Sequence, residues 1–435
     1  MAKHHQWLKQ EVAQWQAEGL VDSALAQRIL GRYPETAERG WGRIVFSAIG
    51  AVLVGLGVIL FFAYNWHVIP KPAKLALVFG ALAAAHGTAM TLARSAQPNR
   101  GLIEGLHALG TMLFGAGIWL VAQIYHIDEH YPNAFLVWSL GALALAWAMP
   151  SLVQALLALF LVAFWAGVEM FQFHAPMHGA PLLVVLGVLP LAWWRRSPAL
   201  LFWALAVLFV VTAFAVAGIR LEALFSFLFI MGAAAFIAGV AAPTTAFPDA
   251  EGPLHRVGLL VVLGIGYALS FPRVASELGK VNFASRTALA IYFVAAGAAL
   301  LAAVVAAATS ISRAGWRHVD IFRRWQLALI GVGLAIVLGC LVARACAGGW
   351  AIALPFNAIV LGLAALLILE GSAHLLPRQV GAGCLLFALV TVSRYADLFS
   401  SLLVRAAVFV ALGVGLFLVG NFYARHRRRA QQVQS

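Results

Sequence analysis

Residues 199–218 read ALLFWALAVLFVVTAFAVAG, and residues 221–241 read LEALFSFLFIMGAAAFIAGVA. Each run, at a rise of about 1.5 Å per residue, is long enough to cross the ~30 Å hydrocarbon layer of a bilayer as one α-helix. Continuous apolar runs of this length also exclude a transmembrane barrel, whose strands alternate in polarity over about ten residues. The two runs therefore predict a polytopic helical membrane protein.

The composition of the whole chain agrees with these two runs. Of its 435 residues, 63% are hydrophobic and only 10% are charged, whereas a soluble domain carries about 25% charged residues. Soluble globular folds, disordered chains and coiled coils are thereby excluded. The three cysteines, Cys340, Cys346 and Cys384, lie inside apolar runs, where a thiol behaves as a small hydrophobic group. They indicate neither a disulfide scaffold nor a redox or metal site.

Similar apolar runs recur along the chain, each ended by charge, proline or polar residues. Because a span needs about 20 mainly apolar residues, the sequence predicts an all-α transmembrane bundle of about fourteen spans, with twelve or thirteen as alternatives. Pro190 in the sixth run and Pro355 in the twelfth are expected to interrupt their helices. The predicted spans are 44–64, 73–92, 106–125, 134–149, 152–171, 177–194, 199–218, 221–241, 257–271, 288–307, 325–345, 351–369, 380–395 and 402–422.

The distribution of basic residues predicts the topology, because Lys and Arg accumulate in short cytoplasmic loops. With a cytoplasmic N-terminus, twenty of the 29 Lys and Arg residues fall on the cytoplasmic side. This bias predicts an even number of spans and both termini in the cytoplasm. It also attributes the net charge of +13 to topology and to attraction by anionic membrane lipids, in preference to nucleic-acid binding.

The segment before the first span is the only soluble part of any size, and it shows no cleavable signal peptide. Apolar residues up to Trp15 recur at helical spacing, Gly19 can end that helix, and Asp22 or Ser23 can cap the next. Such a hairpin buries little core by itself, so we expect it to pack on the membrane domain, on lipid or on a protein partner bound by residues 1–40. The predicted domains are a cytosolic amphipathic helical hairpin at 1–43, a transmembrane domain at 44–424 and a basic cytosolic tail at 425–435.

Three stretches show glycine, aromatic and polar residues in a characteristic order: Trp15 to Tyr33 with the first span ending FFAYNWH at 61–67, Gly115 to Ile127, and Arg394 to Arg405. In these stretches the chain resembles the bacterial predicted membrane proteins of the domain-of-unknown-function 2157 family. The resemblance divides the transmembrane domain into family-like parts at 44–150 and 390–424 and middle spans at 151–389. It implies a bacterial inner-membrane location, many spans and an N-terminal cytosolic segment. It implies no activity and transfers no catalytic residue.

Polar residues inside spans mark the places to search for function, because a charge at a helix centre costs about 2.5–3.5 kcal/mol on insertion scales. In the predicted topology most of them fall at the outer ends of helices, which indicates an outward-facing polar vestibule. Gln123 and His126 share one helix face, and Arg405 can snorkel outward or meet Glu169 or Asp397. The alternative is that these groups only fix helix packing. The candidate substrate or interhelical cluster comprises Asn65, Trp66, His67, Gln123, His126, Glu169, Arg394, Asp397 and Arg405.

The densest group of potential metal ligands is His126, Asp128, Glu129 and His130. Imidazole and carboxylate groups can hold zinc or another divalent ion. The spacing of these four residues is not an established metal motif, so a solvated acidic loop is favoured and no metal or other cofactor is predicted. The glycines of the apolar runs permit close helix contact, and none forms a phosphate-binding loop.

Three classes of function remain. The first is transport or flipping of a small or lipid-linked solute through the outward-facing vestibule, for which interrupted helices are suitable binding sites. The second is a membrane assembly, sensing or envelope-maintenance component that acts through protein partners. The third and least favoured is an outer-face enzyme that acts on a lipid-linked substrate, so the chain is more readily a non-enzyme. Membrane lipids are the predicted partners, and the sequence assigns no oligomeric state.

Overall fold

The computed structural model describes residues 11–32, 69–96, 98–127, 130–149, 151–281, 287–343 and 348–398, together with 410–411, 413–415 and 417–419. It separates into two compact units, residues 1–77 and 78–435. The predicted first span and more than half of the fourteenth lie outside the described residues. Every described element of regular secondary structure is an α-, 3₁₀- or π-helix, so the all-α class is confirmed.

The first unit contains the N-terminal helical hairpin. Residues 11–17 are helical, and α2 (Ser23–Arg32) follows. Gly19 ends the first helix with a φ of 72°, and the Leu20 N–H donates to the Trp15 carbonyl, a Schellman arrangement in which glycine avoids Cβ strain. Asp22 Oδ1 accepts a hydrogen bond from the Leu25 N–H and so caps α2. Both local predictions are confirmed.

The hairpin buries little, as its size predicts. Val12 and Ala26 are its buried apolar residues among those described, whereas Leu20 and Leu25 are exposed. The prediction that residues 1–40 contact lipid or a protein partner stays a prediction.

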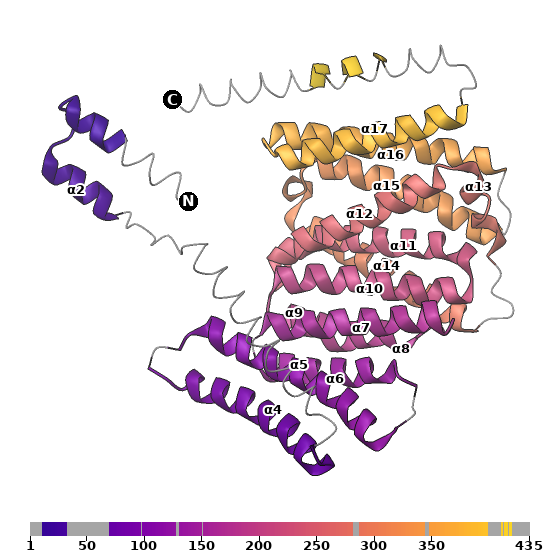
Figure 1. Ribbon diagram of the computed structural model, residues 1–435. Coiled ribbons are helices and arrows are strands. Elements are labelled where there is room, and N and C mark those ends of the chain that lie inside the picture. The colour runs from indigo at the N-terminus through magenta and orange to yellow at the C-terminus, as the bar shows by residue number, and fades with distance from the viewer. Residues whose placement is uncertain are drawn as a thin grey trace. The chain divides into compact units, whose positions relative to one another are not determined.

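The second unit is a stack of long helices that alternate in direction (Figure 1). Helix α4 (Lys71–Ala93) crosses the boundary between the units. The other long helices are α5 (Arg100–Tyr125), α6 (Asn133–Ala148), α7 (Leu152–Gln172), α10 (Pro198–Ile219), α11 (Leu221–Ala241), α12 (Glu251–Leu269), α14 (Thr287–Ala314), α15 (Ile321–Ala343), α16 (Gly349–Ala373) and α17 (Pro377–Leu398). The short elements are α8 (Gly179–Leu183), α9 (Leu189–Trp194), α13 (Pro272–Ala275), a π-helical turn at Val184–Val188, and 3₁₀ turns at Ala242–Thr244, Pro248–Ala250, Leu278–Lys280 and Trp316–His318.

Helix α11, one of the two runs quoted first, lies at the centre of this stack. It packs against α10, α12, α14 and α15, and α16 packs against α12, α15 and α17. Phe229 and Phe236 of α11 are fully buried. A Cβ on Gly258 of α12 would lie 2.5 Å from the Phe236 backbone nitrogen, so only glycine permits this close approach.

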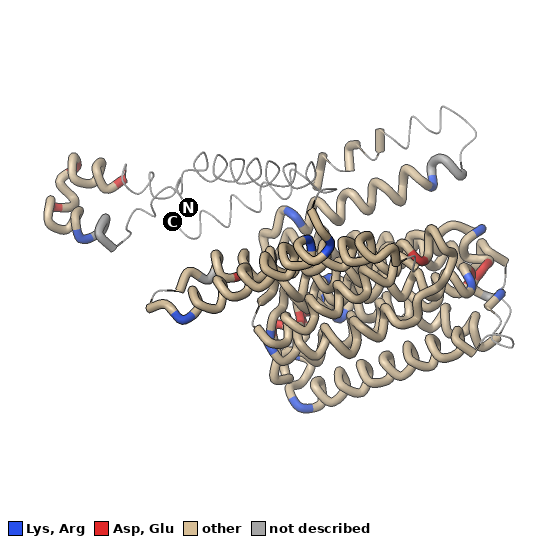
Figure 2. The backbone as a smooth tube through the Cα atoms, turned by 60° about the horizontal axis from the view of Figure 1, so that its bottom comes forward, with Lys and Arg blue, Asp and Glu red and all other residues tan. Residues whose placement is uncertain are grey.

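Nine of the described helices are long and apolar enough to cross a membrane. The fourth and sixth predicted spans correspond to two shorter apolar helical segments, Asn133–Ala148 and Gly179–Trp194. The thirteenth corresponds to α17, which is helical but is not among the nine. Charged residues of the second unit gather mainly at the two ends of its helices (Figure 2).

The two prolines that were expected to interrupt helices behave differently. Before Pro190 the helix widens into the π turn, in which the Leu189 N–H donates to the Val184 carbonyl five residues back. The wider turn accommodates a proline that has no N–H to donate. The expected interruption at Pro355 is wrong, because α16 continues through it from Gly349 to Ala373. Pro355 lies in the second turn of α16, where it removes one backbone hydrogen bond, and its neighbours Ala353 and Phe356 are fully buried.

Candidate functional sites

The larger candidate site is a cavity of about 920 Å³ in the second unit, lined by α4, α5 and α6. Its walls are mainly apolar, and Phe79, Leu82 and Phe114 contribute to them. Its polar groups come from the C-terminal end of α5 and the N-terminal end of α6. We call this cavity the α5–α6 groove; its polar residues are Gln123, His126, His130, Tyr131 and Asn133.

Two predicted site residues, Gln123 and His126, line this groove. Both are exposed, and their spacing of three residues on α5 places them on one face. His126 has a φ of 50°, and the N–H of Ile127 donates to the Ala122 carbonyl, so His126 occupies a helix-ending position that glycine usually takes. A non-glycine residue in this conformation costs of order 1–3 kcal/mol. His174, Arg196 and Leu375 have the same conformation, so it is the position of His126 in the groove that makes its imidazole a candidate for binding.

Glu169 of α7 is the buried carboxylate of this region. It is 2% exposed, and the His130 Nε2–H donates to its Oε1 at 2.7 Å. Its other oxygen, Oε2, has no hydrogen-bond partner among the described residues. The ring of Phe173 packs edge-on against His130, with 4.3 Å between ring centroids. A buried carboxylate needs such a donor, because an unpaired charge there is strongly unfavourable.

A polar ladder joins α4, α5 and α7 beside the groove, and the sequence analysis did not predict it. His86 Nδ1 lies 2.9 Å from His107 Nδ1, so one imidazole donates and the other accepts. The Thr111 hydroxyl lies within hydrogen-bond distance of both the His107 carbonyl and Gln154 Oε1, while Gln154 Nε2 has no partner among the described residues. Polar bonds between helices in lipid fix their spacing, so the ladder holds the groove's walls in register.

Arg394 lies in a different cluster, on the far side of the stack. Its Nη2 donates to Ser270 Oγ at 2.9 Å, and its guanidinium lies 4.0 Å from the centroid of the Phe271 ring. Asn357 of α16 donates to the Ser270 carbonyl at 3.0 Å. This group joins the ends of α12, α16 and α17.

The remaining predicted site residues have these positions. Asp397 is in the last turn of α17. The others, Asn65, Trp66, His67, Asp128, Glu129 and Arg405, lie outside the described residues. Among the residues that are described, no group of three or more His, Cys, Asp or Glu side chains is arranged to hold a metal ion.

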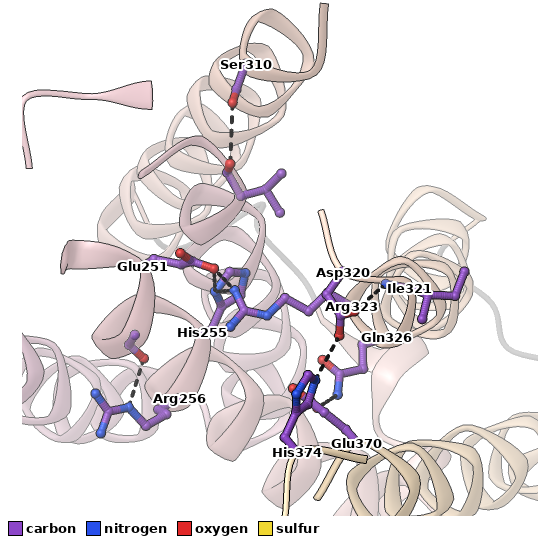
Figure 3. A network of polar contacts seen from close by, with 12 residues as sticks. Glu251, His255, Arg256, Ser310, Asp320, Ile321, Arg323, Gln326, Glu370 and His374 are labelled. Atoms are coloured by element: carbon purple, nitrogen blue, oxygen red, sulfur yellow. Dashed lines mark hydrogen bonds and ion pairs between the residues drawn. The ribbon is translucent and has the colours of Figure 1, made fainter. Parts of the chain in front are cut away.

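The second candidate site lies at the opposite ends of the helices, where the sequence analysis predicted no site. A cavity of about 380 Å³ is lined there by Glu251 and His255 of α12, Asp320 and Arg323 at the start of α15, and Glu370 and His374 at the end of α16. Figure 3 shows their side chains converging from these three helices. We call this group the basic-end network, because several arginines lie close to its members in the sequence. They are Arg256, Arg313, Arg317, Arg324 and Arg378.

Arg323 is the centre of the basic-end network. Its Nη1 contacts Glu251 Oε1 as an ion pair and lies 2.9 Å from His255 Nδ1. Gln326 Nε2 donates to Glu370 Oε2 at 3.0 Å, and His374 lies 3.9 Å from Asp320. The spacing of Glu251 and His255, four residues apart on one helix, was the available sequence signal. Their partner Arg323 is 72 residues from Glu251, and hydropathy carries no information about such pairs.

Together, the long apolar helices and the two polar sites define a multi-span membrane protein. Residues 13–155 match the model of the family described as predicted membrane protein DUF2157, which confirms the family resemblance over this part of the chain. No curated protein and no solved structure matches the chain. The matched part includes the α5–α6 groove, whereas the basic-end network and the family-like part predicted at 390–424 lie beyond it.

Proposed function

We propose that the protein binds and moves a small or lipid-linked amphiphile across the bacterial inner membrane, with its apolar part in the α5–α6 groove. The observation that carries the proposal is the division of this groove into apolar walls and one polar end. Its volume of about 920 Å³ is within the range of about 300–1,000 Å³ that ligand pockets occupy. An acyl chain matches the walls, and Gln123, His126 and His130 match a polar head.

The polar end also supplies chemistry for recognising the head group. Gln123 offers both a donor and an acceptor, and the imidazole of His130 is oriented by Glu169. The exposed residues His126 and Gln123 lie at only one end of the groove. A head group would bind at that end, while its acyl chain remains in apolar surroundings. In the proposed topology of fourteen spans with cytoplasmic termini, this end faces outward.

The first prediction tests this function directly. The full-length protein is reconstituted in vesicles that contain phosphatidylethanolamine and phosphatidylglycerol labelled with nitrobenzoxadiazole, and flipping is measured by dithionite quenching. Ala134→Trp fills the groove and is expected to slow flipping about tenfold, equivalent to ~1.4 kcal/mol. Leu140→Trp places the same ring on the same helix at an exposed position that does not line the groove, and it is expected to leave the rate unchanged.

The outcomes are distinct. A rate that exceeds that of protein-free vesicles and responds only to Ala134→Trp supports the proposal. Equal rates in vesicles with and without protein, or equal responses to both tryptophan variants, would contradict it.

A further inference from the structure

The basic-end network has one nitrogen atom that the described structure leaves unexplained. His255 is 7% exposed, and its Nε2 has no hydrogen-bond partner among the described residues. Arg323 can only donate hydrogen bonds, so His255 Nδ1 must accept from it. The imidazole is therefore neutral, with its proton on Nε2. A buried donor without a partner costs about 1–3 kcal/mol, which is unusual for a group that serves packing alone.

The second unexplained feature is an imbalance of charge. Arg323 is shared by Glu251 and His255 through one nitrogen, Nη1, which has two hydrogens, one for each acceptor. Glu370 lines the same cavity, but the partner of its Oε2 is the neutral amide of Gln326. One arginine thus faces two glutamates, and in the described contacts it forms an ion pair with Glu251. Glu370 interacts with Arg323 through its charge, but its hydrogen bond comes from an uncharged amide.

We propose that the basic-end network is a proton-binding site, in which a proton on His255 Nδ1 replaces Arg323 as the partner of Glu251 and frees Arg323 to pair with Glu370. The proton comes from water at the basic end and forms a new N–H bond. Arg323 keeps all its protons and only changes partner. This inference rests on the proposed transport function, to which it adds an energy source.

The geometry permits this exchange without a large movement. His255 Nδ1 already lies 3.9 Å from Glu251 Oε1, one turn away on the same helix. Once protonated, Nδ1 becomes a donor and can no longer accept from Arg323. The arginine then has Glu370 available within the same cavity, with Oε1 as acceptor. Both carboxylates acquire a cationic partner, so the exchange itself favours the bound proton.

The remaining groups that face His255 do not compete for its proton. The face of α11 against the imidazole consists of Phe236 and Gly239, which carry no charge. Asp320, directly before α15, lies near His374, directly after α16. Two arginines of this end donate to backbone carbonyls instead, as Arg256 to Gly252 and Arg324 to Trp316 and Val319. Figure 3 shows Arg256 directed away from the cavity.

The exchange links proton binding to helix contacts. The present state joins α12 to α15 through Glu251 and Arg323. The protonated state joins α15 to α16 through Arg323 and Glu370. Helices α11 and α16 each contact both α12 and α15. An ion pair that moves from α12–α15 to α15–α16 is therefore the kind of two-state element that couples an ion to a conformational change.

The second prediction is that the two glutamates differ in importance at high pH and become equal once His255 is protonated. Thermal unfolding midpoints of the full chain in detergent are measured at pH 8 and at pH 5.5 for Glu251→Gln and Glu370→Gln. Both residues are only partly buried, so both variants are expected to fold. At pH 8 we expect Glu251→Gln to lower the midpoint by about 2–4 °C more than Glu370→Gln. At pH 5.5 we expect equal midpoints, because each variant then loses one carboxylate that has a cationic partner.

The same convergence is then measured in two histidine backgrounds. It should vanish in His255→Gln and persist in His374→Gln, which alters an exposed imidazole of the same cavity. An unchanged difference between the two glutamate variants at both pH values, or a convergence that survives His255→Gln, would overturn the proposal. These midpoints do not depend on flipping, so a failed flipping assay with an intact convergence would contradict the proposed transport alone.

Discussion

At the level of single residues, the candidate site shows what a sequence can and cannot reveal. Gln123 and His126 were predictable because their spacing places them on one face of a helix, and both line the α5–α6 groove. The partner of Glu169 was not predictable. Arg405 was one of the expected partners, but the structure places His130, 39 residues away, at 2.7 Å. Pairs of this kind depend on how α6 lies against α7, and no local pattern encodes that contact.

The third prediction concerns His126, whose left-handed backbone costs stability. His126→Gly removes the Cβ clash and is expected to raise the unfolding free energy by up to about 1 kcal/mol, because part of the gain is lost to glycine's freedom in the unfolded chain. Flipping should slow at the same time, since the imidazole lines the polar end of the groove. Unfolding midpoints and dithionite quenching measure the two effects.

A matched control exists at the end of α16. Leu375 has a φ of 56°, and the Leu376 N–H donates to the Gly371 carbonyl in the same motif, away from the groove. Leu375→Gly should therefore raise stability without slowing flipping. If His126→Gly is also stabilising and flips lipid at the original rate, the imidazole has no part in head-group recognition.

At the level of helices, position along the chain was predictable and neighbours were not. Hydropathy located the helices because a span must be long and apolar, and serine and proline marked some of their starts, as Ser197 and Pro198 do for α10. Which helices touch was not visible, because nearly every face of an uninterrupted apolar run is equally apolar. Glycine was the main exception, since it marks places where backbones approach closely.

The fourth prediction uses two glycines of α12. A Cβ at Gly258 would lie 2.5 Å from the backbone nitrogen of Phe236, which cannot move aside as a side chain could. Gly258→Ala is therefore expected to destabilise the protein by about 1–3 kcal/mol through overpacking. Gly264 on the same helix has open space around it, so Gly264→Ala should be neutral or stabilising by up to about 1 kcal/mol. Thermal unfolding of the two variants decides the matter, and equal midpoints would contradict the close packing of α11 and α12.

At the level of the whole molecule, the two candidate sites lie at opposite helix ends of the second unit. The α5–α6 groove has its polar groups where α5 ends and α6 begins, and the basic-end network lies where α12 and α15 begin. Because the helices alternate in direction, these places belong to opposite ends of the stack. A protein that binds an amphiphile at one surface and a proton at the other could use a proton gradient across the membrane.

The fifth prediction tests which end faces the cytoplasm. In a variant without the three native cysteines, His174→Cys and Trp316→Cys mark the groove end and the basic end, in the connections after α7 and after α14. Because arginines concentrate at the basic end, a membrane-impermeant maleimide applied to intact cells should label position 174, and position 316 should react only after the cells are opened. Labelling of both positions in intact cells would contradict their placement at opposite surfaces, and labelling of position 316 alone would reverse the orientation and place the proton site outside. In the reversed orientation the proton would bind on the side from which protons enter the cell, and the amphiphile on the cytoplasmic side.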